Sequence, residues 1–241
     1  YNYALLIHQE VEDKRSEGIL SGNIGLIHWK QGRQEKALEH YSRALNIHQA
    51  VGNRRHEGLI LGNMGLSYWT LGENEEALKF YNRALTIHQE VEDRRGESRV
   101  LGNMGLALAD KGRMGEALEH YNRAVLLHQE VGNRRQESIV LVNLGILNME
   151  QGRPKQALEH YNRALLISQE TGDRRTEGVV LGNIGVMHMI QGRPEQALEH
   201  YNRALLISQE TGDRREEGSI LGHIAYACAC QGDISTARQH L

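Results

Sequence analysis

Residues 152–191 read GRPKQALEHYNRALLISQETGDRRTEGVVLGNIGVMHMIQ, and variants of this stretch follow one another along the 241-residue chain. The period is 40 residues, because one glycine recurs, always with alanine five residues later, at Gly32, Gly72, Gly112, Gly152, Gly192 and Gly232. Repeats of this length are typical of solenoids, in which each unit buries its apolar face against its neighbours and the stack presents a long concave surface. The period therefore predicts an array of repeats and favours binding over catalysis.

Each unit contains two amphipathic helices. From Glu35 to about Val51, apolar residues recur at spacings of three and four, which places them on one face of a helix. A second stretch of this kind runs from about Arg54 to Leu71 and must pack against the first. The unit is therefore predicted to be an antiparallel helix pair.

Residues suited to helix ends separate these stretches. Gly72 suits a left-handed helix end, and Pro154 and Pro194 stand where a first helical turn tolerates proline. Short turns before Arg-Arg pairs supply residues that can cap the next helix, namely Asn53, Asp173 and Asp213.

The 40-residue unit resembles a tetratricopeptide repeat. The residues that carry the resemblance are Ile24, Gly25, Gly32, Ala37, Tyr41 and Ala44, and their spacing recurs in every complete unit. The resemblance implies an all-α fold, a right-handed superhelical solenoid of antiparallel helix pairs. A 40-residue unit is longer than the usual one, and is similar to the repeats of Partner-of-Inscuteable-type scaffolds and to sensor arrays of bacterial signalling ATPases.

The resemblance covers the whole chain, so residues 1–241 are interpreted as a single solenoid fragment cut from a longer array. The predicted helix pairs are 14–51, 54–91, 94–131, 134–171 and 174–211, with half repeats at 1–11 and 214–241. Neither half repeat has the polar outer face of a capping helix, so we expect fraying or end-to-end self-association there.

Composition excludes several function classes. The formal net charge is -3 with both signs interspersed, so neither a nucleic-acid groove nor an anionic membrane surface is indicated. No apolar run approaches the roughly 18 residues that span a bilayer, which predicts a soluble, cytoplasmic protein. Cys228 and Cys230 lie two apart on one predicted helix and cannot form a disulfide with each other.

Residues capable of catalysis or metal binding do not form a recognisable site. His40 and His48 are eight residues apart, about 12 Å along a helix, which is too far for one metal ion. No phosphate-binding glycine motif or nucleophile elbow occurs. We therefore predict no enzyme activity, no cofactor and no metal, and interpret the row His8, His48, His88 and His128 as packing residues.

A glutamate recurs three residues after a base, at Glu17, Glu57, Glu97, Glu137, Glu177 and Glu217. We interpret these pairs as links on the helix surface, worth a few tenths of a kcal/mol each.

If the resemblance holds, helices such as 54–71 line the concave groove. Stepping 100° per residue from Ile19 places Gly22, Asn23 and Leu26 on its face. The most regular row there is Asn23, Asn63, Asn103, Asn143 and Asn183, which ends at His223. In related repeats, asparagines at this position resemble a clamp for the backbone of an extended peptide. The alternative is that each asparagine bonds the adjacent helix and sets the superhelix.

Glycine and arginine rows flank the asparagines. The glycines, at 22, 62, 102, 182 and 222, imply close approach by either a ligand or the neighbouring helix, because a mid-helix glycine costs about 1 kcal/mol relative to alanine. The arginine row could bind ligand carboxylates or could form salt bridges at the helix start. Its members are Arg15, Arg55, Arg95, Arg135, Arg175 and Arg215.

Apolar groove positions favour a mixed ligand with apolar anchors. They include Leu66, Leu106 and Ile146. One further position varies, reading Ile19, Leu59, Arg99, Ile139, Val179 and Ser219, and its mostly apolar character argues against an acidic partner.

Three function classes follow. The leading prediction is a protein–protein interaction module that binds an extended peptide in the groove. The second is a regulatory sensor array of a larger signalling protein, such as a signalling ATPase. The third is a passive, self-assembling scaffold.

Overall fold

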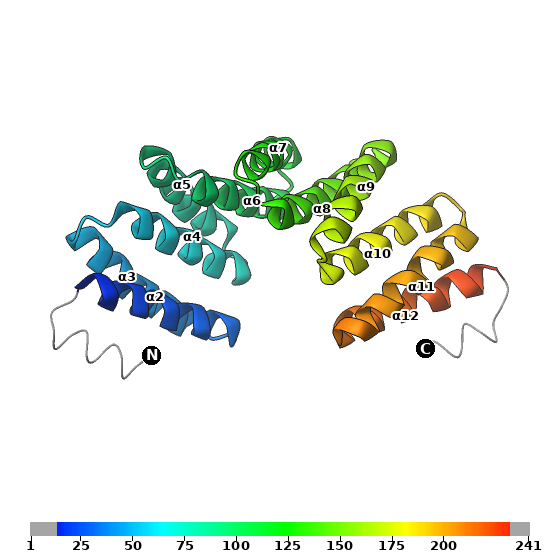
Figure 1. Cartoon of the computed structure of the whole chain (residues 1–241), viewed down its shortest axis with the longest axis horizontal. Helices are drawn as coiled ribbons and strands as arrows, with labels where there is room; N and C mark the ends of the chain where they lie inside the picture. Colours follow the sequence, from blue (N-terminus) through cyan, green and yellow to red (C-terminus); the bar gives the residue numbers. More distant parts are fainter. Residues whose placement is uncertain (1–13, 232–241) are drawn as a thin grey trace. The chain divides into compact units, whose positions relative to one another are not determined.

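The computed structural model describes residues 14–231, which are helical throughout apart from short turns and contain no strand (Figure 1). The predicted all-α class is confirmed. The helices are α2 (Lys14–Lys30), α3 (Gln34–Ala50), α4 (Arg54–Thr70), α5 (Asn74–Glu90), α6 (Arg94–Asp110), α7 (Met114–Glu130), α8 (Arg134–Glu150), α9 (Pro154–Thr171), α10 (Arg174–Ile190), α11 (Pro194–Thr211) and α12 (Arg214–Cys230). The predicted half repeat 1–11, with His8, and the end of the half repeat 214–241 lie outside the described residues.

Even-numbered helices pack along the odd-numbered helices that follow them, as in the pairs α2/α3 and α10/α11 (Figure 1). A glycine of the first helix makes this approach possible. A Cβ added to Gly65 would lie 2.6 Å from ring carbons of Tyr81, which is fully buried. The same arrangement joins Gly145 to Tyr161. Each pair is therefore held by an aromatic ring against bare backbone.

The helix ends follow the predicted chemistry. Gly72 has a φ of +80°, in the left-handed region that glycine tolerates. Pro154 opens α9 at the first turn. The Asp173 side chain caps α10 by accepting a hydrogen bond from the backbone of Thr176.

The chain divides into two compact units, Tyr1–Val131 and Gly132–Leu241. The first contains α2–α7 and the second α8–α12. Each has its own buried core. In the second unit, Tyr201, Ile220 and Ile224 belong to one apolar cluster with Leu181.

Five of the six recurring glutamates are buried, so for these five the prediction of surface salt links was wrong in its placement; Glu217 is half-buried. Glu97 and Glu137 are 1% and 0% exposed. Glu97 accepts hydrogen bonds from Gln89 of α5, Arg94 of its own helix and Arg123 of α7. One carboxylate therefore joins three helices. Helical spacing alone revealed only the arginine three residues earlier, because the other two donors come from neighbouring helices.

Candidate peptide-binding surface

The five asparagines of the predicted clamp are all half-buried on even-numbered helices. Among the described residues of either unit, none of their side-chain amides takes part in a hydrogen bond within that unit. The alternative interpretation required bonds to the adjacent helix, and those bonds are absent there. Each asparagine therefore presents a donor and an acceptor that water or a ligand can use.

A hollow in the first unit brings together the residues that 100° stepping assigned to one face. Ile19, Asn23 and Leu26 of α2 line it with Leu59 and Asn63 of α4. Its volume is about 320 Å³. The hollow combines apolar walls with two of the asparagine amides, which suits an extended chain bearing apolar side chains. We call it the apolar hollow.

The glycine row faces the next even-numbered helix. A Cβ on Gly22 would lie 2.7 Å from Cδ1 of Ile60. At Gly62 the nearest atom, Cγ2 of Val100, would be 3.6 Å away, and at Gly182 the nearest, Oε1 of Glu216, would be 3.8 Å away. Helix packing thus explains Gly22, whereas Gly62 and Gly182 have room for a methyl group.

Three of the six arginines in the row form ion pairs with the cap of the following repeat. Arg135 pairs with Asp173 at 2.8 Å and Arg175 with Asp213 at 3.0 Å. Arg55 contacts Asp93 at 3.6 Å. These contacts match the alternative prediction of a salt-bridged helix start. The arginine side chains remain more than half exposed, so each pair contributes little to stability.

Arg95 differs from these three. Within the described part of its unit it forms no ion pair. Position 133, which corresponds to Asp93, Asp173 and Asp213, is asparagine.

The predicted apolar anchors lie on the even-numbered helices, one turn beyond the asparagines. Leu66 and Leu106 are half-buried, and Ile146 is 38% exposed. They are accessible enough to contact a ligand. Trp69, at the edge of this face, donates a hydrogen bond from Nε1 to Asp110 at 2.7 Å.

The described members of the histidine row, His48, His88 and His128, pack in the interior. His48 and His128 are almost completely buried, and burial lowers the pKa of each to about 4, aided at His48 by the neighbouring His56. Both are therefore neutral near pH 7. Within residues 14–231, no three histidine, cysteine, aspartate or glutamate side chains converge to hold a metal ion.

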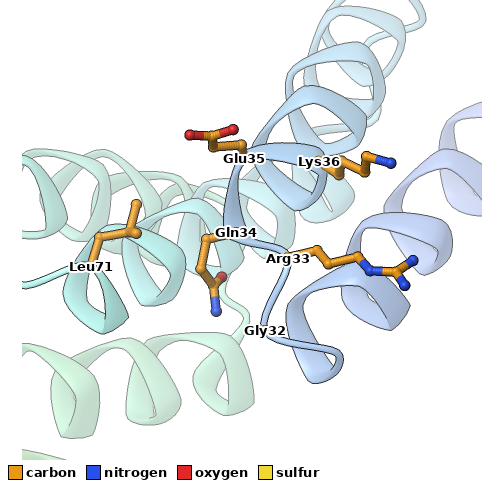
Figure 2. Close-up of a pocket in the computed structure, with 6 residues that line it drawn as sticks. All are labelled: Gly32, Arg33, Gln34, Glu35, Lys36 and Leu71. Atoms are coloured by element: carbon orange, nitrogen blue, oxygen red, sulfur yellow. The ribbon is translucent and has the colours of Figure 1, made fainter.

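A larger hollow, of about 470 Å³, lies at the turn between α2 and α3 (Figure 2). Figure 2 shows Gln34 between Leu71 and the turn, with the charged ends of Arg33 and Lys36 directed away from Leu71. A similar hollow recurs one repeat later at Gly72–Glu76 and Lys111. We assign no site there, because most of its lining residues are exposed and its recurrence follows from the stacking of the repeats.

The chain belongs to the tetratricopeptide repeat family. The family's profile matches residues 15–90, 96–170 and 176–241. Repeats of this family are typically protein-interaction modules. No curated protein matches the chain. None of the described helices is long and apolar enough to cross a membrane.

Solved structures share the fold at low sequence identity. One is a signal transduction ATPase with numerous domains from Pyrococcus horikoshii, which has a tetratricopeptide repeat sensor; the TM-score is 0.83 at 16% identity, over 98% of this chain and 36% of that one. A second is aspartyl phosphate phosphatase F from Bacillus subtilis, with a TM-score of 0.77 at 15% identity; the match covers 100% of this chain and 73% of that one. A third is a Rap protein complexed with Competence and Sporulation Factor, with a TM-score of 0.77 at 17% identity; the match covers 94% of this chain and 62% of that one.

Proposed function

We propose that this chain is an interaction module that binds an extended peptide segment of a partner protein along the even-numbered helices. The asparagine row contacts the peptide backbone, and the half-buried apolar residues hold its side chains. Leu66, Leu106 and Ile146 are the anchors, and Arg95, which forms no ion pair within the described part of its unit, is free to accept a new partner. We place the module in the cytoplasm, where its two cysteines, both free, stay reduced.

The asparagine amides carry the proposal. Asparagine is a mediocre residue in the middle of a helix, so five of them at one position require a compensating role. No hydrogen bond within the described part of either unit supplies that role. An extended peptide offers an unpaired N–H and C=O at each residue, which a side-chain amide can match with its own acceptor and donor.

The test is a peptide-library selection on the intact 241-residue chain, followed by affinity measurement with the enriched peptides. A triple variant, Asn23→Ala, Asn63→Ala and Asn103→Ala, removes the amides of one unit. We expect it to bind at least tenfold more weakly. Its circular dichroism should stay helical and its stability should not fall, because alanine is the better helix former.

A matched triple variant controls for composition. Asn82→Ala, Asn122→Ala and Asn162→Ala remove three exposed asparagines from odd-numbered helices. This control should bind as the unchanged chain does. If no peptide is enriched, or if both triple variants bind equally well, the proposal is wrong.

A second candidate is a sensor array that holds a signalling domain inactive. The likeness to a signalling ATPase whose own repeats form a sensor favours it. This candidate predicts that the natural polypeptide also carries a nucleotide-binding domain with a Gly-x4-Gly-Lys-Ser/Thr motif, and that deleting the repeats raises its hydrolysis rate. The passive scaffold predicts instead concentration-dependent association without a groove ligand, which size-exclusion chromatography over a range of concentrations would detect.

A further inference from the structure

The position of the histidine row holds different residues in the two units. His48, His88 and His128 lie in the first unit, near the ends of α3, α5 and α7. At the equivalent positions of α9 and α11 the second unit has Ser168 and Ser208. All five side chains are almost completely buried, with 0–2% exposed. A position that holds a titratable ring in one unit therefore holds a neutral hydroxyl in the other.

The two serines have hydrogen-bond partners within their own helices. Ser168 donates a hydrogen bond to the carbonyl oxygen of Leu165 at 2.8 Å, and Ser208 donates one to that of Leu205 at 2.8 Å. A serine hydroxyl does not change its charge when the pH falls. The second unit therefore gains no charge at this position on acidification.

His48 is buried without a partner for either ring nitrogen. Within the described part of its unit, neither nitrogen forms a hydrogen bond. On one side α2 comes so close that a Cβ added to Gly18 would lie 2.7 Å from Cε1 of His48. Protonation would leave a charged ring with two N–H donors unpaired in the interior, which is more costly than a neutral ring there.

The charged groups around His48 do not offset this cost. His56 of α4 has its ring centre 5.1 Å away, so two protonated rings would repel each other. Glu57, also on α4, favours the charged form of His48, but its oxygens already accept two hydrogen bonds. Arg99 of α6 lines the apolar hollow together with His48 and adds a further positive charge. Burial, strengthened by His56, lowers the pKa of His48 to about 4.

His88 has a different environment, because its Nδ1 lies 3.2 Å from Oδ2 of Asp93. That carboxylate favours the protonated ring. Burial has the largest effect and lowers the pKa of His88, and Arg99 and Arg55 act in the same direction. His88 thus has a partner for its proton, whereas His48 has none.

The second unit also contains histidines, but at more open positions. His188 and His200 stack on each other, with ring centres 5.3 Å apart, and both are half-buried, as is His160. Burial lowers the pKa of all three, the same direction as at His48. Because these rings keep some contact with solvent, water can hydrate the charged form, and protonation costs less than at a fully buried ring.

We propose that the first unit is a pH-sensitive element: in mild acid, protonation of His48 opens the packing of α3 against α2 and α4, and with it the apolar hollow, while the second unit stays folded. Helices in repeat arrays depend mainly on their near neighbours, so one unit can open without the other. The opening does not depend on the peptide-binding function. One consequence does rest on that function, namely that a peptide held in the apolar hollow is released on acidification.

The size of the effect follows from the proton balance. The ordinary pKa of 6.5 applies to the open form, whereas the closed form holds His48 at about 4. The open form therefore takes up the proton first as the pH falls, so the stability from this residue is complete above about pH 6.5 and declines towards pH 4. At pH 5 the equilibrium should shift towards the open form by about ten- to thirtyfold through His48 alone.

Hydrogen–deuterium exchange of the 241-residue chain, measured by mass spectrometry at pH 7 and pH 5, tests the proposal. Protection factors correct for the intrinsic pH dependence of exchange. They should fall at least tenfold in α2–α4 and by a clearly smaller factor in α9–α11. Equal losses in the two units, or no loss in the first, would overturn the proposal.

The variant His48→Ser gives this position the residue that the second unit already has. It should be less stable at pH 7, because the smaller side chain leaves a cavity, but its protection in α2–α4 should fall by less than about threefold between pH 7 and pH 5. The matched control, His120→Ser, replaces a half-buried histidine of α7 outside the row and should keep the full pH dependence. A full pH dependence in His48→Ser as well would contradict the role of His48.

NMR titration of the unchanged chain gives an independent measurement should His48→Ser fail to fold. The Cε1–H resonance of His48 should show a protonation midpoint below about pH 5. A midpoint near pH 6.5 in the folded chain would overturn the proposal.

Peptide binding separates this proposal from the function proposed above. Peptides that are enriched at pH 7 and lack titratable side chains should bind at least tenfold more weakly at pH 5, and His48→Ser should reduce this difference. If the first unit opens in acid but no peptide is enriched, the peptide-binding function is wrong and the pH-sensitive element stands. If peptides bind equally well at both pH values although the unit opens, the release of the peptide is wrong.

Discussion

At the scale of single residues, glycines three positions apart on α4 have opposite roles. Gly65 lies against the ring of the buried Tyr81, and an added Cβ would be 2.6 Å from it. Gly62 leaves 3.6 Å to its nearest neighbour, an ordinary van der Waals distance. The glycine rows that contain Gly62 and Gly65 recur in the sequence with the same regularity. Only the packing shows that Gly65 must be glycine whereas Gly62 can be replaced.

This difference predicts opposite effects of one substitution. Gly62→Ala should raise the free energy of unfolding by up to about 1 kcal/mol, because alanine is the better helix former. Gly65→Ala should lower it by about 1–3 kcal/mol, because the buried tyrosine has no free space to move into. Urea unfolding of the two variants, followed by circular dichroism, measures both. Equal effects would contradict the packing described here.

Burial of His128 predicts a loss of stability in mild acid. Its pKa of about 4 in the folded chain lies below the ordinary 6.5, so the neutral form is the one that folding favours. The stabilisation is complete above about pH 6.5 and is lost as the pH falls towards 4, because the unfolded chain takes up the proton first. By pH 5 the cost is roughly 1–2 kcal/mol for this residue.

The urea midpoints at pH 7 and pH 5 measure this loss of stability. The variant His128→Leu removes the contribution of this histidine to the pH dependence. The variant should therefore lose less stability between the two pH values than the unchanged chain does. An identical pH dependence would show that His128 titrates normally. Gly32→Ala, at an exposed turn, is a variant whose pH dependence should remain unchanged even though its stability falls.

At the scale of helices, buried glutamates link neighbouring helices through hydrogen bonds. Glu97 receives hydrogen bonds from α5, α6 and α7. Burial alone would raise the pKa of this carboxyl, but the donors Gln89, Arg94 and Arg123 outweigh it and lower the pKa. The sequence predicted the bond to Arg94 correctly. It could not show the other two, because residues 8 and 26 positions away meet only when the helices pack.

Glu97→Gln should therefore destabilise the chain more than the same change at position 217. Glu97 is 1% exposed, whereas the Glu217 side chain is 13% exposed and its partner Arg214 is 88% exposed. We expect a loss of about 1–3 kcal/mol at Glu97 and a smaller loss at Glu217. Chemical denaturation measures the free energy of unfolding of both variants. An equal loss at the two positions would contradict the proposal that Glu97 stabilises the packing of three helices.

At the scale of the molecule, helices contact only near neighbours along the chain within each unit. Stability in such arrays is close to a sum of repeat and interface contributions, so distant repeats unfold with little coupling. Both tryptophans, Trp29 and Trp69, lie in the first unit, so fluorescence reports on that unit while circular dichroism reports on all helices.

A substitution in the second unit should therefore affect the two signals differently. A Cβ at Gly185 would lie 2.5 Å from Cε1 of Tyr201, so Gly185→Ala destabilises the second unit. We expect an early loss of circular dichroism in urea and a nearly unchanged fluorescence midpoint. Gly65→Ala, in the first unit, should lower the fluorescence midpoint. If the fluorescence and circular dichroism midpoints coincide in the unchanged chain and in both variants, the chain unfolds as one cooperative unit.

The sequence by itself determined the helix pairs, their caps and the face that each even-numbered helix presents, because these depend on spacings within one 40-residue period. It also left two alternatives for the asparagine, glycine and arginine rows. Only the tertiary structure decided which glycines meet a neighbouring helix and which arginines meet an aspartate. The physical reason is that these properties depend on distances between helices one repeat apart, and the period of the sequence makes every repeat look alike until such neighbours are brought together.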